Sequence, residues 1–185
     1  MAAALRGGAR LVQVRAKDLP ARALLALARE GVASARAQGG LLLVNDRPDV
    51  ALLAGADGAH LGQEDLPPRD ARRALPAYAL LGLSTHDDGQ VEAASGEPVD
   101  YVAIGPVFPT STKEDARPTV GLDGVRSARA RTRLPLVAIG GITADNARAV
   151  IEAGADGVAV LSAVLAGDDV EAAVRRLRAA VGDTG

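Results

Sequence analysis

The feature that most constrains the fold is a regular alternation of short apolar runs with longer segments of helical period. Apolar runs rich in Leu, Val and Ile stand at 11–14, 41–45, 58–61, 80–84, 101–105, 136–140 and 157–161. Segments of helical period fill 20–38, 48–54, 68–75, 87–95, 122–131, 143–153 and 168–181. Strands that alternate with helices in this way predict βα units on a parallel sheet.

The punctuation between these units repeats. The sequence Ala-Gly-Ala-Asp-Gly occurs at 54–58 and again at 153–157, each time just before an apolar run. We expect the first glycine of each copy to end a helix in the left-handed conformation. No Gly-x-Gly-x-x-Gly turn follows the first apolar run, so the repeat favours a closed barrel over an open nucleotide-binding sheet.

The number of strands is one short of a complete barrel. Strand starts run from 11 to 157 in six steps, about 24 residues for each unit, and a TIM-type barrel has eight units. Residues 2–6 resemble the end of a helix. The prediction is a single α/β domain over 1–185, a TIM-type (β/α) barrel that lacks its first strand and most of its first helix. We therefore expect the natural protein to begin upstream of Met1.

Composition excludes several function classes. The 185 residues carry 21 basic and 23 acidic side chains, a net charge of −2, with no basic run for nucleic acid. There is no cysteine for thiolate chemistry, and no apolar stretch has the roughly 20 residues of a membrane span. These features predict a cytoplasmic protein that binds neither nucleic acid nor membrane. They leave open whether it forms a homo-oligomer.

Polar residues follow the predicted strands, at the edge where such barrels place their active sites. The segments are Gln13–Lys17, Asn45–Arg47, His60–Asp65, Ser84–His86, the stretch from Pro106 to Lys113, Gly140–Gly141 and Leu161–Ser162. Only two of the 21 basic residues are lysines, and both Lys17 and Lys113 fall in this set. A compact ammonium group suits a phosphate, so these lysines indicate phosphate binding.

Charge and spacing predict two anion sites. Asp46 and Asp65 end neighbouring strands and could share a hard cation such as Mg²⁺. Arg15, Lys17 and Lys113 would face the same phosphates, with Asn45 orienting them. Gly140–Gly141 and Leu161–Ser162 offer backbone N–H groups for a second, metal-free phosphate.

Structural interpretations of these residues stay open. Asp46 could pair with Arg47, and Asp65 could cap the helix near Pro67. His60 lies within a predicted strand, which favours packing. Ser84 and His86 suggest a nucleophile and its base, but no acid is placed to orient the histidine, which disfavours a hydrolase.

Seven motifs together resemble the thiamine-phosphate synthase family. They are Gln-Val-Arg-Ala-Lys at 13–17, Asn-Asp-Arg at 45–47, the run from Asp57 to Asp65, Gly-Leu-Ser-Thr-His at 82–86, the run from Gly105 to Lys113, Ala-Ile-Gly-Gly-Ile at 138–142 and the run from Gly154 to Ser162. They follow the family order over nearly the whole chain. The Pro-Thr-Ser-Thr-Lys block is the specific one, whereas Gly-Gly-Ile occurs in many phosphate-binding barrels.

The resemblance implies a transferase that couples 4-amino-5-hydroxymethyl-2-methylpyrimidine diphosphate with a thiazole phosphate and releases pyrophosphate. The implied pyrimidine site comprises Gln13, Val14, Arg15, Ala16, Lys17, Asn45, Ser84 and Lys113, of which Arg15, Lys17 and Lys113 act catalytically on the diphosphate. Asp46 and Asp65 would hold Mg²⁺. The implied thiazole phosphate site comprises Thr110, Ser111, Thr112, Gly141, Leu161 and Ser162.

Two departures and two alternatives accompany this interpretation. The family often has Glu where Ala16 stands, and its opening strand is missing here. A thiazole tautomerase of the same scaffold is one alternative, but Pro106 and Lys113 favour the synthase. A non-catalytic phosphate-binding remnant is the other, and the presence of Asp46, Asp65 and both lysines disfavours it.

Overall fold

The computed structural model describes residues 1–110 and 118–182. Seven strands run through this part of the chain: β1 (Leu11–Val14), β2 (Leu41–Asn45), β3 (Gly58–Leu61), β4 (Leu80–Thr85), β5 (Tyr101–Ile104), β6 (Leu136–Ile139) and β7 (Gly157–Ala159). The helices are α1 (Ala2–Arg6), α2 (Ala21–Ala37), α3 (Pro48–Ala54), α4 (Pro68–Ala74), α5 (Asp88–Ala94), α6 (Gly121–Arg131), α7 (Ala147–Glu152), α8 (Ser162–Leu165) and α9 (Val170–Val181).

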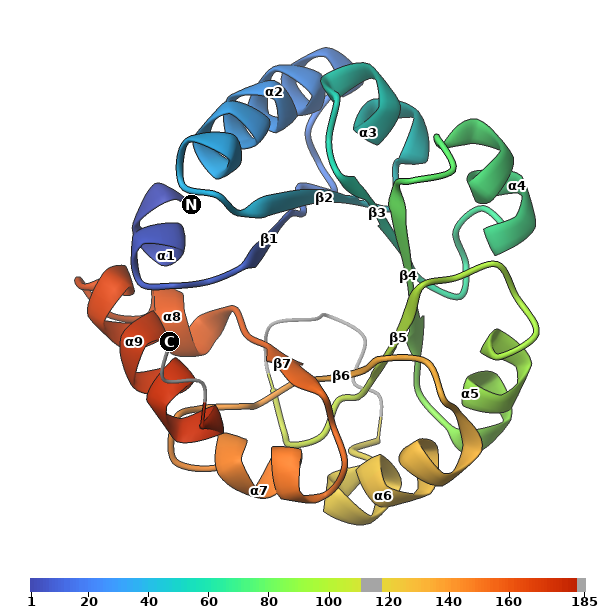
Figure 1. Cartoon of the computed structure of the whole chain (residues 1–185), viewed down its shortest axis with the longest axis vertical. Helices are drawn as coiled ribbons and strands as arrows, with labels where there is room; N and C mark the ends of the chain where they lie inside the picture. Colours follow the sequence, from blue (N-terminus) through green and yellow to red (C-terminus); the bar gives the residue numbers. More distant parts are fainter. Residues whose placement is uncertain (111–117, 183–185) are drawn as a thin grey trace.

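The strands form one parallel sheet in chain order, from β1 to β7. The sheet curls into a ring, and the helices lie outside it (Figure 1). This arrangement is the TIM-like α/β fold predicted from the alternation of strands and helices. Prolines begin α3 and α4, where the missing N–H would have had no helical acceptor.

Alternate residues of each strand divide between two faces. Leu42, Val44, Leu61 and Leu81 point outward and join one apolar cluster with helix residues such as Val32. The opposite face, inside the ring, carries polar or small residues toward the carboxyl ends of β2, β3 and β4, where the register pairs Asn45 with His60 and His60 with Gly82. The outer face therefore supplies most of the hydrophobic stabilisation, and polar groups gather on the inner face at the carboxyl edge of these strands.

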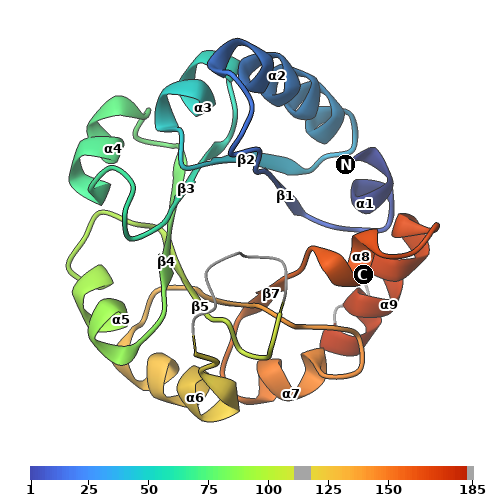
Figure 2. The same ribbon diagram turned by 180° about the vertical axis from the view of Figure 1, so that it is seen from behind.

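The inner ring is not closed by hydrogen bonds within the described residues. β1 pairs with β2 and β7 pairs with β6, but β1 and β7 do not pair with each other. Leu11 and Leu41, on the inner face near this gap, are 39% and 40% exposed. The helix layer does close, because α1 packs against α9 (Figure 2). Arg6 of α1 binds Glu171 of α9 at 2.9 Å.

The repeated Asp before a strand has a structural role. The carboxylate of Asp57 accepts a hydrogen bond from Leu42 N at 2.8 Å, and its own N–H binds the carbonyl of the same leucine. Asp100 and Asp156 repeat both contacts with the starts of β4 and β6. Each aspartate thus fixes its strand to the preceding one at the amino edge of the sheet, which explains why the motif recurs.

Several predicted boundaries need correction. Strand β7 ends at Ala159 instead of 161, and α7 begins at Ala147 instead of 143, because Thr143–Asn146 forms a hydrogen-bonded turn. The short helix α8 was not predicted, since its residues fell in the segment between β7 and α9. Among the described residues, no helix is both long and apolar enough to cross a membrane.

Candidate active site

A polar stripe crosses the inner face at the carboxyl edge of the first four strands. The side-chain amide of Gln13 donates to Oδ1 of Asn45 at 3.2 Å. Asn45 is the register partner of His60, whose Nε2 lies 2.8 Å from Oγ of Ser84. The side chains come from β1, β2, β3 and β4, so the curl of the sheet brings together groups that are far apart in sequence.

Two carboxylates lie beside this stripe. Asp46 follows β2 with a left-handed backbone, φ 64°, and its N–H binds the carbonyl of His60 at 2.8 Å. Burial, together with a hydrogen bond and the negative charge of Asp65, raises the pKa of Asp46 to about 6, against the lowering effect of Lys17 and Arg15. A carboxylate destabilised by its carboxylate neighbour is suited to binding a cation.

The structural alternatives for these carboxylates are wrong within the described residues. Arg47 pairs with Asp49 at 2.6 Å and not with Asp46. Asp65 accepts from Gly62 N at 2.6 Å, which closes a turn after β3, and α4 begins with Pro67 at its N-cap and no capping side chain. Both carboxylates therefore remain available to bind a cation at the carboxyl edge of the sheet.

The two histidines have different partners. Ser84 bonds to His60 and not to His86, so the nucleophile–base pair that the sequence disfavoured does not form. Nδ1 of His86 lies 2.6 Å from the carbonyl oxygen of Gly105. His60, expected to pack, is buried but has both ring nitrogens in hydrogen bonds, the second with the hydroxyl of Tyr101 at 2.7 Å.

The second predicted anion site lies across the ring. Gly140 and Gly141 have φ of 98° and 64°. A Cβ atom on Gly141 would lie 2.6 Å from the carbonyl oxygen of Pro109, so only glycine lets the segment after β5 approach this closely. Asn146 holds the turn by donating to the carbonyl of Gly141 at 3.0 Å. This packing brings the segment that leads to Thr110 against the glycine pair.

The remaining predicted site residues are placed as follows. Arg15 and Lys17 are exposed after β1, Ala16 is half-buried, and Leu161 and Ser162 are exposed after β7. Val14 is buried on the helix side, so its side chain faces away from the site and only its backbone could contact a ligand. Ser111, Thr112 and Lys113 lie outside the described residues.

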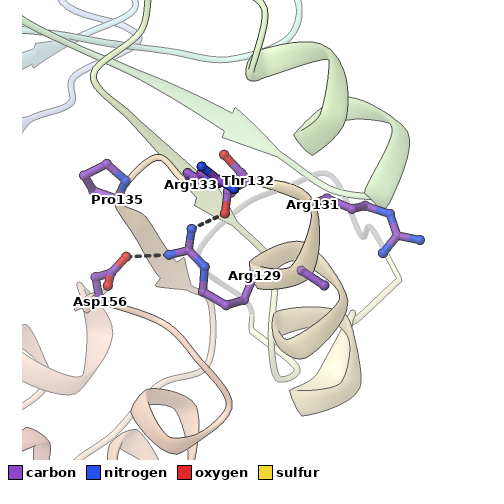
Figure 3. Close-up of a pocket in the computed structure, with 7 residues that line it drawn as sticks. Arg129, Arg131, Thr132, Arg133, Pro135 and Asp156 are labelled. Atoms are coloured by element: carbon purple, nitrogen blue, oxygen red, sulfur yellow. Dashed lines mark hydrogen bonds and ion pairs between the residues drawn. The ribbon is translucent and has the colours of Figure 1, made fainter.

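A separate hollow of about 790 Å³ lies at the amino edge of the sheet (Figure 3). Arg129 crosses it and binds Asp156 at 2.8 Å, and it also donates to the carbonyl oxygens of Thr132 and Leu134. These contacts join α6 to the start of β7. The hollow is at the edge opposite the polar stripe. The guanidinium group of Arg129, which crosses the hollow, already has protein partners.

A curled parallel sheet with its polar groups at the carboxyl edge defines a TIM-like α/β fold, the class in which enzymes place their active sites at that edge. Solved structures agree: the fold matches 3-hexulose-6-phosphate synthase with a TM-score of 0.71 at 19% identity, over 97% of this chain and 93% of that chain. It matches a thiamine phosphate pyrophosphorylase from Pyrococcus furiosus with a TM-score of 0.90 at 37% identity, over 98% and 87%.

Sequence comparison identifies the family. A profile described as thiamine monophosphate synthase matches residues 1–164. Thiamine-phosphate synthases from Moorella thermoacetica and Methanoculleus marisnigri are 48% and 52% identical, each over 178 residues. The alignments cover 96% and 95% of this chain and 85% and 83% of those proteins. The chain belongs to the thiamine monophosphate synthase family, which confirms the resemblance drawn from the motifs.

Proposed function

We propose that this protein couples the pyrimidine diphosphate with the thiazole phosphate to form thiamine phosphate and pyrophosphate. The observation that carries the proposal is the pair of carboxylates, Asp46 and Asp65, beside Arg15 and Lys17 at the carboxyl edge. This arrangement suits a diphosphate with a divalent cation, and the tautomerase alternative has no diphosphate to bind. Family membership favours the same assignment.

We propose Mg²⁺ as the cation, held by Asp46 and Asp65. The donor set fits, because both groups are hard oxygen ligands and a cation would relieve the destabilisation of the buried Asp46 carboxylate beside Asp65. When bound, the ion would neutralise charge on the diphosphate. Within the described residues no cluster of three or more metal-ligating side chains occurs, so the substrate would complete the coordination.

The reaction needs charge stabilisation more than a protein nucleophile. The bond from the pyrimidine methylene carbon to the diphosphate oxygen breaks, and its electron pair leaves with pyrophosphate. The thiazole nitrogen then forms the new C–N bond with its lone pair. Arg15, Lys17 and Lys113 would stabilise the leaving diphosphate. Gln13, Asn45 and Ser84 would hold the pyrimidine ring, with the Val14–Ala16 backbone alongside.

The thiazole phosphate would occupy the opposite side of the ring. We place it against Gly141, Leu161 and Ser162, with Thr110, Ser111 and Thr112 covering it from the segment after β5. Backbone N–H groups near the glycine pair are the donors available for its phosphate. This position sets the thiazole across the barrel mouth from the polar stripe that would hold the pyrimidine.

We also propose that the free edges of β1 and β7 accommodate one further strand, giving a closed eight-stranded barrel. The exposed inner-face leucines, Leu11 and Leu41, support this, and so does the half-exposed β7. A strand there would satisfy both edges and cover the apolar surface. We further assign the protein to the cytoplasm, where small phosphorylated substrates are available.

The function is tested by mixing both substrates and measuring pyrophosphate and thiamine phosphate together. We expect the two products in equal amounts, with loss of activity in excess chelator and recovery on adding Mg²⁺. Asp46→Asn and Lys113→Ala should each lower turnover by about 100-fold or more, as removal of a transition-state charge does. A folded protein that forms no thiamine phosphate, or that is fully active in chelator, would contradict the proposal.

A further inference from the structure

The sequence motifs do not explain a hydrogen-bonded chain of three side chains inside the barrel. Oη of Tyr101 lies 2.7 Å from Nδ1 of His60, and Nε2 of the same ring lies 2.8 Å from Oγ of Ser84. The three residues come from β5, β3 and β4. One end of the chain is the serine that we place against the pyrimidine, so the other two residues can affect how that serine binds.

The geometry of the chain is tightly fixed. The rings of His60 and Tyr101 pack with centroids 5.4 Å apart and an interplanar angle of 31°. The tyrosine ring occupies the volume above Gly82, where a Cβ atom would lie 2.1 Å from Cζ. Gly82 on β4 is the register partner of His60 on β3 and of Tyr101 on β5. The absent side chain at 82 is therefore what lets the phenol reach the imidazole.

The position of each proton follows from the donors and acceptors available. Burial raises the pKa of Tyr101 above its usual value, so the phenol keeps its proton. Among residues 1–110 and 118–182, the hydroxyl of Tyr101 has one hydrogen-bond partner, Nδ1 of His60. A phenol in this partly buried position would lose free energy if its proton had no acceptor, so Tyr101 donates to Nδ1.

The tautomer of His60 determines whether Ser84 accepts or donates in the hydrogen bond between them. A neutral imidazole that accepts at Nδ1 carries its proton on Nε2, so His60 donates to Oγ of Ser84. The hydroxyl of Ser84 then has its own proton free for another acceptor. With the opposite tautomer, Ser84 would donate to His60 and would present only lone pairs to a ligand.

We propose that Tyr101 and His60 are positioning residues that make Ser84 a hydrogen-bond donor, so that Ser84 recognises a ring nitrogen of the pyrimidine and not its exocyclic amino group. This inference rests on the proposed contact between Ser84 and the pyrimidine. It assigns a specificity function to Tyr101, which touches no substrate in this arrangement. Gly82 is required for that function, because the absence of a side chain there leaves room for the ring of Tyr101.

The tautomer can be measured without substrate. The chain has two histidines, so two-bond ¹H–¹⁵N correlation spectra of labelled protein contain two imidazole patterns. His86 is an internal reference, because its Nδ1 faces a carbonyl oxygen and must carry a proton there. We expect the opposite pattern for His60, with the proton on Nε2, and a mixed pattern in Tyr101→Phe. A proton on Nδ1 of His60 in the unmodified protein overturns the proposal.

The recognition of the ring nitrogen is tested with pyridine analogues of the pyrimidine diphosphate in which C–H replaces one ring nitrogen. The unmodified enzyme should discriminate against one analogue by about tenfold in kcat/KM, the effect of one lost hydrogen bond. Ser84→Ala should abolish this discrimination, and Tyr101→Phe should reduce it. In both variants KM for the thiazole phosphate should stay unchanged, which a general loss of packing would not give.

The matched control is Tyr78→Phe, at a tyrosine that is 85% exposed, and it should behave as the unmodified enzyme. Unfolding temperatures of all variants separate loss of fold from loss of recognition. If Ser84→Ala keeps full discrimination, the proposed pyrimidine contact itself is wrong. If Ser84→Ala loses the discrimination while Tyr101→Phe keeps it in full, Ser84 does contact the pyrimidine. The proposed effect of Tyr101 on Ser84 through His60 is then wrong.

Discussion

The ring of Tyr101 occupies the space that a side chain on Gly82 would need: a Cβ atom on Gly82 would lie 2.1 Å from Cζ of the tyrosine ring. The contact joins neighbouring strands β4 and β5 at a position where the backbone of Gly82 is not left-handed. Glycine is therefore required here by packing and not by backbone conformation.

The first prediction concerns this contact. Gly82→Ala should displace the tyrosine ring and lower the free energy of unfolding by about 1–3 kcal/mol, the range for an overpacked core. Chemical denaturation measures the change. The matched control is Gly157→Ala, on the inner face of β7, where an added Cβ would meet no atom within 4 Å among the described residues. Equal effects of the two substitutions would contradict the packing argument.

The second prediction concerns the pH dependence of stability in excess chelator. The raised pKa of Asp46, about 6 against 3.8, means that the ionised carboxylate costs stability above about pH 6 and costs none below about pH 4. Asp46→Asn should therefore be more stable than the unmodified protein at pH 8, on the order of 1 kcal/mol after discounting for solvent screening. The advantage should vanish near pH 4.

Asp49 gives a control of opposite sign. Its hydrogen bond with Arg47 lowers the pKa of Asp49, so its ionised form contributes stability that is present at neutral pH and lost on acidification. Asp49→Asn should be slightly less stable at pH 8, with the difference fading as pH falls. Adding Mg²⁺ should then stabilise the unmodified protein and not Asp46→Asn. A common sign for both substitutions would exclude the electrostatic explanation.

The third prediction concerns the repeated aspartates before the strands. Asp57→Ala leaves Leu42 N without its acceptor and should lower the free energy of unfolding by about 1–3 kcal/mol. Asp57→Asn keeps an acceptor and should lose less. The control is Asp123→Ala, at a side chain that is 98% exposed, which should change stability little. Because Asp57 lies at the amino edge, kcat of the folded variant should remain unchanged.

The fourth prediction concerns the gap between β1 and β7. Joining a designed segment with one short apolar strand to the amino end should raise the unfolding temperature. The amides of β1 and β7 should also gain protection from hydrogen exchange, because a paired edge no longer exposes its N–H groups. The same segment with a central proline, which cannot pair within a sheet, is the control. No gain over the proline control would exclude an eighth strand at this place.

The sequence by itself determined the alternation of strands and helices, the carboxyl-edge position of Asp46, Asp65 and Gly141, and the family. It could do so because hydrophobic period and chain order specify βα units, and because parallel strands all carry their carboxyl ends to one edge. The motifs are local in sequence, so their recognition did not depend on packing.

Only the tertiary structure decided which groups contact one another inside the ring. Ser84 stands two residues from His86, yet its partner is His60, because strand register places His60 and Ser84 on one inner face. Tyr101 joins them because Gly82 leaves room for its ring. Such contacts depend on register and on the curl of the sheet, and the local pattern of a single chain specifies neither.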